Sequence, residues 1–229
     1  MNDAYEFLAK GGVVMLPIAL CSVIALTIFL ERIWVLQRER IIPKQFLALL
    51  TKALGEKRWE RAVSLCDSNE STISKIARRG LDYLGQDREI VKEAMQEAGR
   101  REASYLEKFV GALGAVASVS PLLGLLGTVT GMIKVFGDVA EQFKDGAQLN
   151  AGLLANGIWE ALITTAAGLT VAIPAFLAFK YLMSRIDHFL VELEAQSSAL
   201  VDLVSPPPKR HPLNSDTQET SSEESKESA

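Results

Sequence analysis

The chain has 229 residues, of which 48% are hydrophobic and 23% are charged. Its mean hydropathy of +0.17 is too apolar for an ordinary soluble domain of this length, so the apolar residues must be concentrated in blocks. The net charge of −4 favours neither nucleic acid nor an anionic surface as a partner, and we expect no nucleic-acid binding.

Three uncharged, mostly apolar blocks occur at Gly11–Leu30, Phe109–Ile133 and Ala161–Phe179. Each is close to the ~20 residues that a helix needs to cross a bilayer. The sequence therefore predicts an all-α membrane protein with three transmembrane helices, at residues 11–30, 109–133 and 153–179. We expect the second and third helices to extend into the cytoplasm, where residues 31–108 form a helical loop domain.

Residues 1–10 are short and polar and precede the first span. A cleaved signal peptide is the alternative for residues 11–30. It fits poorly, because no basic region precedes the block and no small-residue cleavage site precedes Glu31. We therefore expect a retained first helix, with a kink at Pro17.

The segment 31–108 carries 16 Lys and Arg against 13 Asp and Glu, which is typical of a solvated helical surface. Its periodicity predicts helices at Pro43–Leu54, Trp59–Cys66, Ser71–Leu84 and Asp87–Phe109, with Asp87 as a candidate cap for the last helix. That last helix is expected to enter the second span. A disulfide between Cys21 and Cys66 is not expected, because the two residues fall in a membrane block and a charged segment.

The second span has a face of small residues on a helical wheel. This face holds Gly124, Gly127, Thr128 and Gly131, and the last glycine pair forms a GxxxG motif that permits close backbone approach. The hydroxyl of Thr128 has two interpretations of similar weight, since it can serve a function or simply bond a carbonyl one turn earlier in its own helix.

The segment 134–152 predicts a short link that joins the second and third spans into a hairpin. Basic residues flank the opposite side of the membrane, for example Arg32, Arg101 and Lys180. The positive-inside rule therefore places the loop domain and the C-terminus in the cytoplasm, and the N-terminus and the link outside.

The third span begins near a single carboxylate, Glu160, with only uncharged residues between it and Lys180. Its wheel places Glu160, Thr164, Thr165 and Gly168 on a small-residue stripe, and Trp159, Ile163 and other bulky residues on a lipid-facing side. The helical pattern continues through residues 180–204, and 205–229 are expected to form a disordered acidic tail. His188 and His211 suggest no metal site, and we expect no cofactor.

Two stretches carry a resemblance to a known family: residues 124–131, GLLGTVTG, and residues 157–175, GIWEALITTAAGLTVAIPA. Together they resemble the ExbB/TolQ/MotA proton-channel family, and three spans with a large first loop are closest to ExbB or TolQ. The resemblance implies a homopentamer in a bacterial inner membrane, with the N-terminus and the link in the periplasm. It further implies an ExbD/TolR-like single-span protein in the central pore and a TonB/TolA-like protein that receives the work.

By motif, Thr128, Glu160 and Thr165 match the polar pore positions of that family. The chain departs from the pattern at Thr130, where relatives often have Trp, and at Thr164, where they often have Ala. Wheel geometry places Thr164 about 40° from Glu160 and Thr165 about 140° away, so geometry alone selects Thr164 as the neighbour. We assign Thr165 to the proton path from the family pattern and keep Thr164 beside it.

The physical argument for Glu160 is that a carboxylate at membrane depth must take up a proton, face water or find a partner. The alternative is that Glu160 bonds within the bundle and only fixes packing. The function expected is a proton-channel subunit that energises a TonB/TolA-like protein, most simply for outer-membrane transport. Alternatives are a TolQ-like envelope-maintenance subunit, a non-conducting membrane scaffold and a solute transporter. No enzyme motif is present in the sequence, so an enzyme is not expected.

Overall fold

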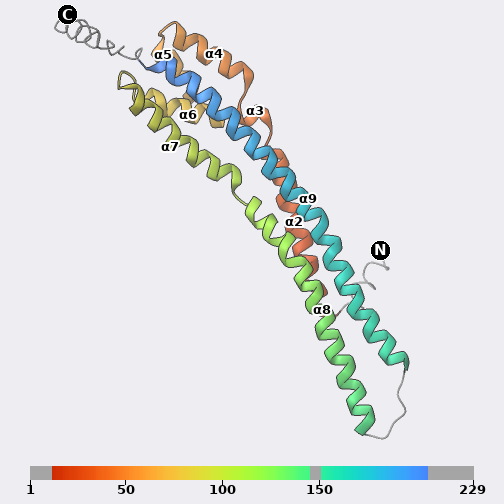
Figure 1. The fold of residues 1–229 in the computed structure, drawn as a ribbon. Coiled ribbons are helices and arrows are strands. Elements are labelled where there is room, and N and C mark those ends of the chain that lie inside the picture. Colours follow the sequence, from red (N-terminus) through yellow and green to blue (C-terminus); the bar gives the residue numbers. More distant parts are fainter. Residues whose placement is uncertain (1–11, 145–150, 206–229) are drawn as a thin grey trace, which may run out of the picture.

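A computed structural model describes residues 12–144 and 151–205, and the described chain is all helical (Figure 1). Residues 1–11, 145–150 and 206–229 lie outside the described residues. These ranges include the predicted N-terminal segment, the middle of the link and nearly all of the acidic tail. The helices are α2 (Met15–Val35), α3 (Arg38–Ile41), α4 (Lys44–Gly55), α5 (Trp59–Asp67), α6 (Thr72–Leu81), α7 (Arg88–Glu107), α8 (Val110–Lys144) and α9 (Ala151–Val204).

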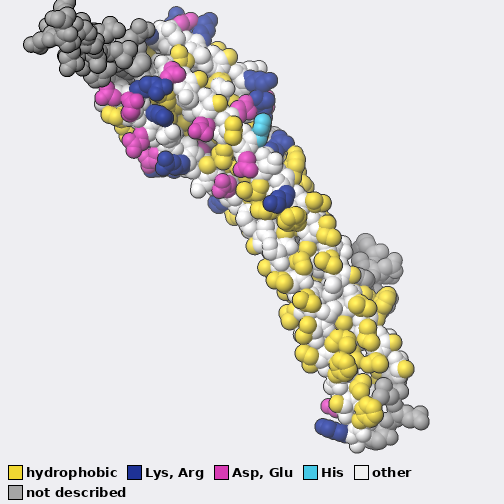
Figure 2. All heavy atoms as spheres, viewed as in Figure 1, with side chains coloured by type: hydrophobic (Ala, Val, Ile, Leu, Met, Phe, Trp, Pro, Cys, Tyr) yellow, Lys and Arg dark blue, Asp and Glu magenta, His cyan; other side chains and the backbone are white. Residues whose placement is uncertain are grey.

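Three stretches of helix are long and apolar enough to cross a membrane: α2, the run that ends in α8, and α9. In Figure 2, hydrophobic side chains cover the surface of this part, and charged side chains gather at the opposite end of the molecule. Large apolar residues that stay exposed, such as Leu20, Leu125 and Leu177, suit contact with lipid. The predicted all-α membrane fold with three spanning helices is confirmed.

Helix α2 begins and ends later than the residues predicted for the first span. Because α2 starts at Met15, Pro17 lies in its first turn, where a missing N–H breaks no helical hydrogen bond. Position 17 therefore gives no reason for a kink within the span. At the other end, α2 continues past Leu30 to Val35 and carries the basic Arg32 in its last turn.

Helix α8 continues past Ile133, the predicted end of the second span, to Lys144, and helix α9 begins at Ala151. Residues 134–144, expected in the link, are thus helical. Val135 is buried, and a Cβ added at Gly157 would overlap its side chain, so the two helices stay in close contact here. The charged residues of this stretch, such as Lys134, Asp138 and Glu141, do not end the helix but lie on its exposed side.

The expected passage from the loop domain into the second span is interrupted at Lys108 and Phe109, between α7 and α8. Phe109 has a φ of 64°, in the left-handed region that side chains disfavour. Arg32 of α2 fills this corner: its guanidinium donates to the carbonyls of Tyr105 and Leu106, each at 3.4 Å. The last carbonyls of a helix lack the usual partners of the helix interior. The Lys108 N–H also donates to the Tyr105 carbonyl, so Arg32 and the cap residue together complete the end of α7.

The charged helical domain comprises α3–α7 and the last part of α9, and its core continues into the membrane part. The bounds of α4, α5 and α7 lie within two residues of the helices predicted from periodicity, whereas α6 is shorter. Ser71 caps α6, because its side chain accepts a hydrogen bond from the Ser74 N–H. Asp87 occupies the cap position of α7 but makes no such bond.

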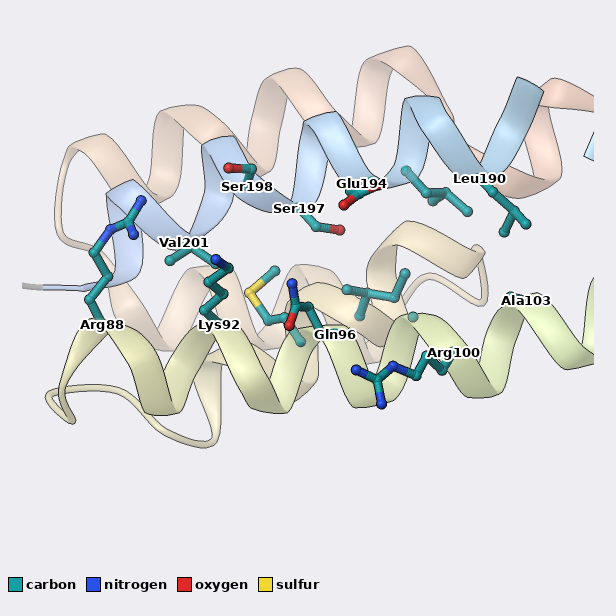
Figure 3. A pocket seen from close by; sticks show the side chains of 14 residues that line it. Arg88, Lys92, Gln96, Arg100, Ala103, Leu190, Glu194, Ser197, Ser198 and Val201 are labelled. Carbon is teal, nitrogen blue, oxygen red and sulfur yellow. The ribbon is translucent and has the colours of Figure 1, made fainter. Parts of the chain in front are cut away.

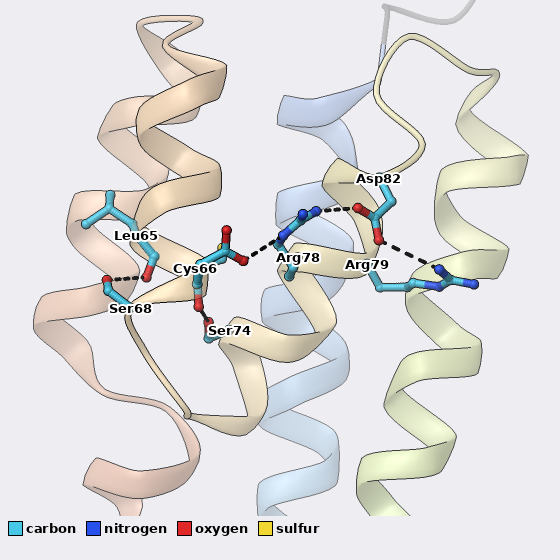
Figure 4. A network of polar contacts seen from close by, with 8 residues as sticks. Leu65, Cys66, Ser68, Ser74, Arg78, Arg79 and Asp82 are labelled. Carbon is cyan, nitrogen blue, oxygen red and sulfur yellow. Dashed lines mark hydrogen bonds and ion pairs between the residues drawn. The ribbon is translucent and has the colours of Figure 1, made fainter.

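Polar contacts join α5 to α6 in this domain (Figure 4). Ser74 Oγ donates to the Cys66 carbonyl at 2.8 Å, and Arg78 Nε donates to Asp67 Oδ1 at 2.8 Å. Arg78 also pairs with Asp82. Figure 3 shows the groove between α7 and α9, with Arg88, Lys92 and Arg100 on one side. Arg88 Nη2 lies 2.6 Å from Oδ1 of Asp202 and bridges the ends of the two helices.

Candidate functional site

The contact between α8 and α9 is built on glycine. A Cβ on Gly168 would lie 2.6 Å from the Ser120 carbonyl oxygen, and a Cβ on Gly124 would lie 3.0 Å from the Cα of Thr165. Both distances are too short for a side chain, so the two backbones touch at these positions. Residues this small allow the close helix contact that stabilises helix pairs in membranes.

The GxxxG pair extends this contact by two further turns of helix. A Cβ on Gly127 would overlap the side chain of Thr164, and a Cβ on Gly131 would lie 3.0 Å from the Cβ of Ala161. Thr164 is consequently only 2% exposed, packed beneath α8. All four glycines singled out in the sequence thus lie between α8 and α9.

The three threonines of the predicted path all donate a hydrogen bond from the hydroxyl group to a backbone carbonyl. Thr165 Oγ1 donates across the helix pair to the Gly124 carbonyl at 3.0 Å. Thr164 and Thr128 each donate to a carbonyl three residues earlier in their own helices, both at 2.7 Å. A hydroxyl oxygen keeps acceptor capacity after donating, so each can still accept a hydrogen bond from water.

Glu160 lies at the far end of the apolar part from the charged domain. A Cβ on Gly12, just before α2, would lie 2.6 Å from Glu160 Oε1, so the carboxylate is level with the start of the first span. From Glu160 to Lys180 the helix rises about 30 Å, one hydrocarbon thickness. Glu160 and Lys180 therefore mark the two ends of the uncharged run on α9.

The single chain brings only part of the predicted set together. Thr164, Thr165 and the glycines meet at the helix contact, whereas Thr128 is half-buried on α8 and bonds within that helix. Glu160 is partly exposed on the α2 side of α9, and it makes no hydrogen bond or ion pair with any described residue. Within residues 12–144 and 151–205, therefore, no hydrogen bond joins the carboxylate to these hydroxyls.

Sequence reasoning placed one residue wrongly and missed the roles of two others. Ile163 was assigned to lipid, but it is buried against Met15 and Ile18 of α2, because the first span covers that side of α9. Gly12 received no role, and Arg32 was used only for the orientation in the membrane. The Gly-Gly pair at the start of the first block was the available signal for Gly12, whereas a basic residue after a span gave no hint of burial.

Metal chemistry has no support in the described part of the chain, where no cluster of three or more His, Cys, Asp or Glu side chains could hold an ion. The polar groups around α8 and α9 are a carboxylate, which can take up a proton, and hydroxyls, which can donate and accept hydrogen bonds.

Comparison with known proteins identifies the family. Residues 68–195 match the model of the MotA/TolQ/ExbB proton channel family, and the chain belongs to this family. It is 36% identical to an ExbB-like biopolymer transport protein of Synechocystis sp. over 80% of this chain and 73% of that protein. It is 26% identical to the biopolymer transport protein exbB1 of Vibrio cholerae over 85% of each chain. The Tol-Pal system protein TolQ of Haemophilus influenzae is 44% identical over 41% of this chain and 40% of its own length.

Family membership confirms the resemblance read from the two motif stretches. It places the chain among channel proteins rather than enzymes, and the three apolar helices make it a multi-pass inner-membrane protein. The matched region begins within the charged helical domain and includes all of α8 and the site on α9.

Proposed function

We propose that the chain is a proton-channel subunit that converts the proton motive force into mechanical work. It does so with an ExbD/TolR-like single-span partner and delivers the work to a TonB/TolA-like protein, for energised outer-membrane transport. The observation that carries this proposal is Glu160, a carboxylate level with the start of the first apolar helix and with no partner among the described residues. Such a group is available to exchange a proton with water or with a partner protein.

The proton path in this proposal runs along Glu160, Thr164, Thr165 and Thr128. Thr128 lies on the outer side of α8 beside Val129, Met132 and Phe136, where another copy or a partner helix can reach it. The Thr128 hydroxyl oxygen can still accept a hydrogen bond from a group on that neighbour. The proton path is then complete only in the assembly and not within one chain. A homopentamer around the single-span partner, surrounded by membrane lipid, would provide such a ring.

The orientation proposed follows from the basic residues at the ends of the spans. The N-terminus and the turn between α8 and α9 lie in the periplasm, and the charged helical domain and the C-terminus lie in the cytoplasm. In this orientation Glu160 stands at the periplasmic boundary, where protons enter. Native mass spectrometry of the complex tests the assembly, and a stable dimer or tetramer would contradict the pentamer.

A cell-based assay separates the proposal from a scaffold role, which the glycine-rich helix contact by itself also suits. Glu160→Gln removes the proton-binding group with little change in size. We expect this variant to assemble with its partner at wild-type levels and to lose energised uptake through outer-membrane receptors. Retained uptake with an intact envelope would support the scaffold, and retained uptake with a damaged envelope would support a TolQ-like role.

A further inference from the structure

The start of the first span lies against the carboxylate of Glu160. A Cβ atom on Gly12 would stand 2.6 Å from Oε1 and 3.8 Å from Cδ of that side chain. Real Cβ atoms essentially never approach another heavy atom within 3.0 Å. The carboxylate therefore occupies space that any other L-residue at position 12 would fill.

The backbone at Gly12 also requires glycine. Its φ is +67°, a conformation that other residues rarely adopt. Directly afterwards the helix begins, with Met15 N–H donating to the Gly12 carbonyl at 3.2 Å and Leu16 N–H donating to the Val13 carbonyl at 3.3 Å. This left-handed residue leads the chain past Glu160 and into α2.

The start of α2 offers a favourable environment for an anion. Its cap residue, Val14, has no side chain that could bond the first turn, and the first turn holds no acidic residue. The N–H groups of Met15, Leu16 and Ile18 already donate to carbonyls of residues 12–14, and residue 17 is a proline. The aligned peptide dipoles nevertheless give such a helix start a partial positive charge. Glu160, which makes no hydrogen bond or ion pair with any described residue, places its carboxylate from α9 beside this helix start.

We propose that Gly12 is a positioning residue for Glu160, an inference that rests on the proton-carrying role proposed for that acid. The absence of a side chain at position 12 lets the carboxylate stand on the α2 side of α9. Thr165 lies on the other side, bonded to the Gly124 carbonyl. The first span thus sets the resting position of the acid, which must leave the start of α2 to reach the hydroxyl side of its helix.

Gly12→Ala in the full chain tests this inference. Oε1 is the end of a flexible side chain, so the new methyl group displaces the carboxylate rather than the helices. The probe is a hydrophobic carbodiimide applied to the chain in liposomes, with Glu160 modification followed by peptide mass spectrometry. We expect the modification rate to change by at least about threefold, since residues in contact couple measurably.

Gly85→Ala is the matched control. Gly85 has a φ of +83° and no heavy atom within 4 Å of its added Cβ, so this variant carries similar backbone strain without touching a carboxylate. We expect it to leave the Glu160 modification rate unchanged. If Gly12→Ala and Gly85→Ala give the same rate, the proposal is overturned.

Glu160→Asp supplies a second, independent comparison. It shortens the acid by one methylene and withdraws the carboxylate from position 12, so Gly12→Ala should then have almost no effect on the modification rate. An undiminished effect on the shortened acid would mean that Gly12 acts through the backbone alone, which overturns the positioning role.

The Glu160→Gln uptake assay keeps the two proposals separable. Uptake retained in Glu160→Gln overturns the proposed function and, with it, the functional meaning of Gly12, whatever the modification rates show. Uptake lost in Glu160→Gln, with equal modification rates in Gly12→Ala and Gly85→Ala, overturns the positioning role only.

Discussion

The thiol of Cys66 is buried where α5 meets α6, and burial raises its pKa from 9.0 to about 11, against smaller opposing effects of Ser74 and Arg78. Because the folded state holds this proton more tightly than the unfolded state, the stability it contributes is complete below pH 9. That contribution is lost as the pH rises through 11.

Alkylation by iodoacetamide tests the raised pKa. At pH 8 the thiolate fraction of Cys66 should be about 100-fold lower than that of an ordinary thiol, since only the thiolate reacts. In a Cys21→Ala background we expect the folded chain to react at least about tenfold more slowly than the same chain unfolded in detergent and urea. Equal rates would show that the thiol is neither buried nor perturbed.

Arg32 is 2% exposed and acts at the corner between α7 and α8. Besides its bonds to two carbonyls, its guanidinium lies 5.4 Å from the ring centre of Phe109, the residue with the left-handed backbone, and its Nε lies 2.9 Å from Glu31 Oε2. A buried cation with these contacts ties the end of the first span to the corner.

Arg32→Met should loosen this corner, because it leaves the Leu106 carbonyl without its donor and the Tyr105 carbonyl with the Lys108 N–H alone, at a cost of about 1–3 kcal/mol. We expect faster hydrogen exchange in residues 103–112 and little change elsewhere in the charged domain. Arg101→Met is the control, since the Arg101 side chain is 75% exposed and pairs only within its own helix. Similar exchange in both variants would contradict a fastening role for Arg32.

At the scale of elements, the α8–α9 pair depends on glycine at some positions and not at others. Gly168→Ala places a methyl group against the Ser120 carbonyl, which is backbone and cannot turn away, so the helices must separate. We expect a lower melting temperature in detergent for this variant. Gly137→Ala in α8 meets no atom within 4 Å and should leave the melting temperature unchanged or slightly raised. Equal melting temperatures would contradict the close contact.

The spans and the stripe of small residues were predictable because length, hydropathy and wheel position are local properties of the chain. The hydrogen bond from Thr165 to Gly124 and the burial of Ile163 under α2 depend on which helices become neighbours, which periodicity does not specify. The break at Phe109 was not predictable either, because Lys108 and Phe109 carry no glycine or proline signal. The capping prediction for Asp87 was only half right, since Asp87 occupies the cap position of α7 but its side chain makes no capping hydrogen bond.

The whole molecule is a long rod in which three helices run side by side along the apolar part, and α8 and α9 continue beyond the start of α2 (Figure 1). Gly12 and Glu160 lie near one end of the first apolar helix, and Arg32 and Phe109 lie near its other end, where the charged domain begins. The unbroken helix α9 joins the carboxylate to this domain.

Proton flux through vesicles tests the central claim most directly. The chain, reconstituted with its ExbD/TolR-like partner, is placed under a pH gradient and proton entry is followed with an internal pH-sensitive dye. We predict flux for the wild-type complex, none above background for the chain alone, and a loss of at least about tenfold for Glu160→Gln. Undiminished flux in the Glu160→Gln complex would contradict the account.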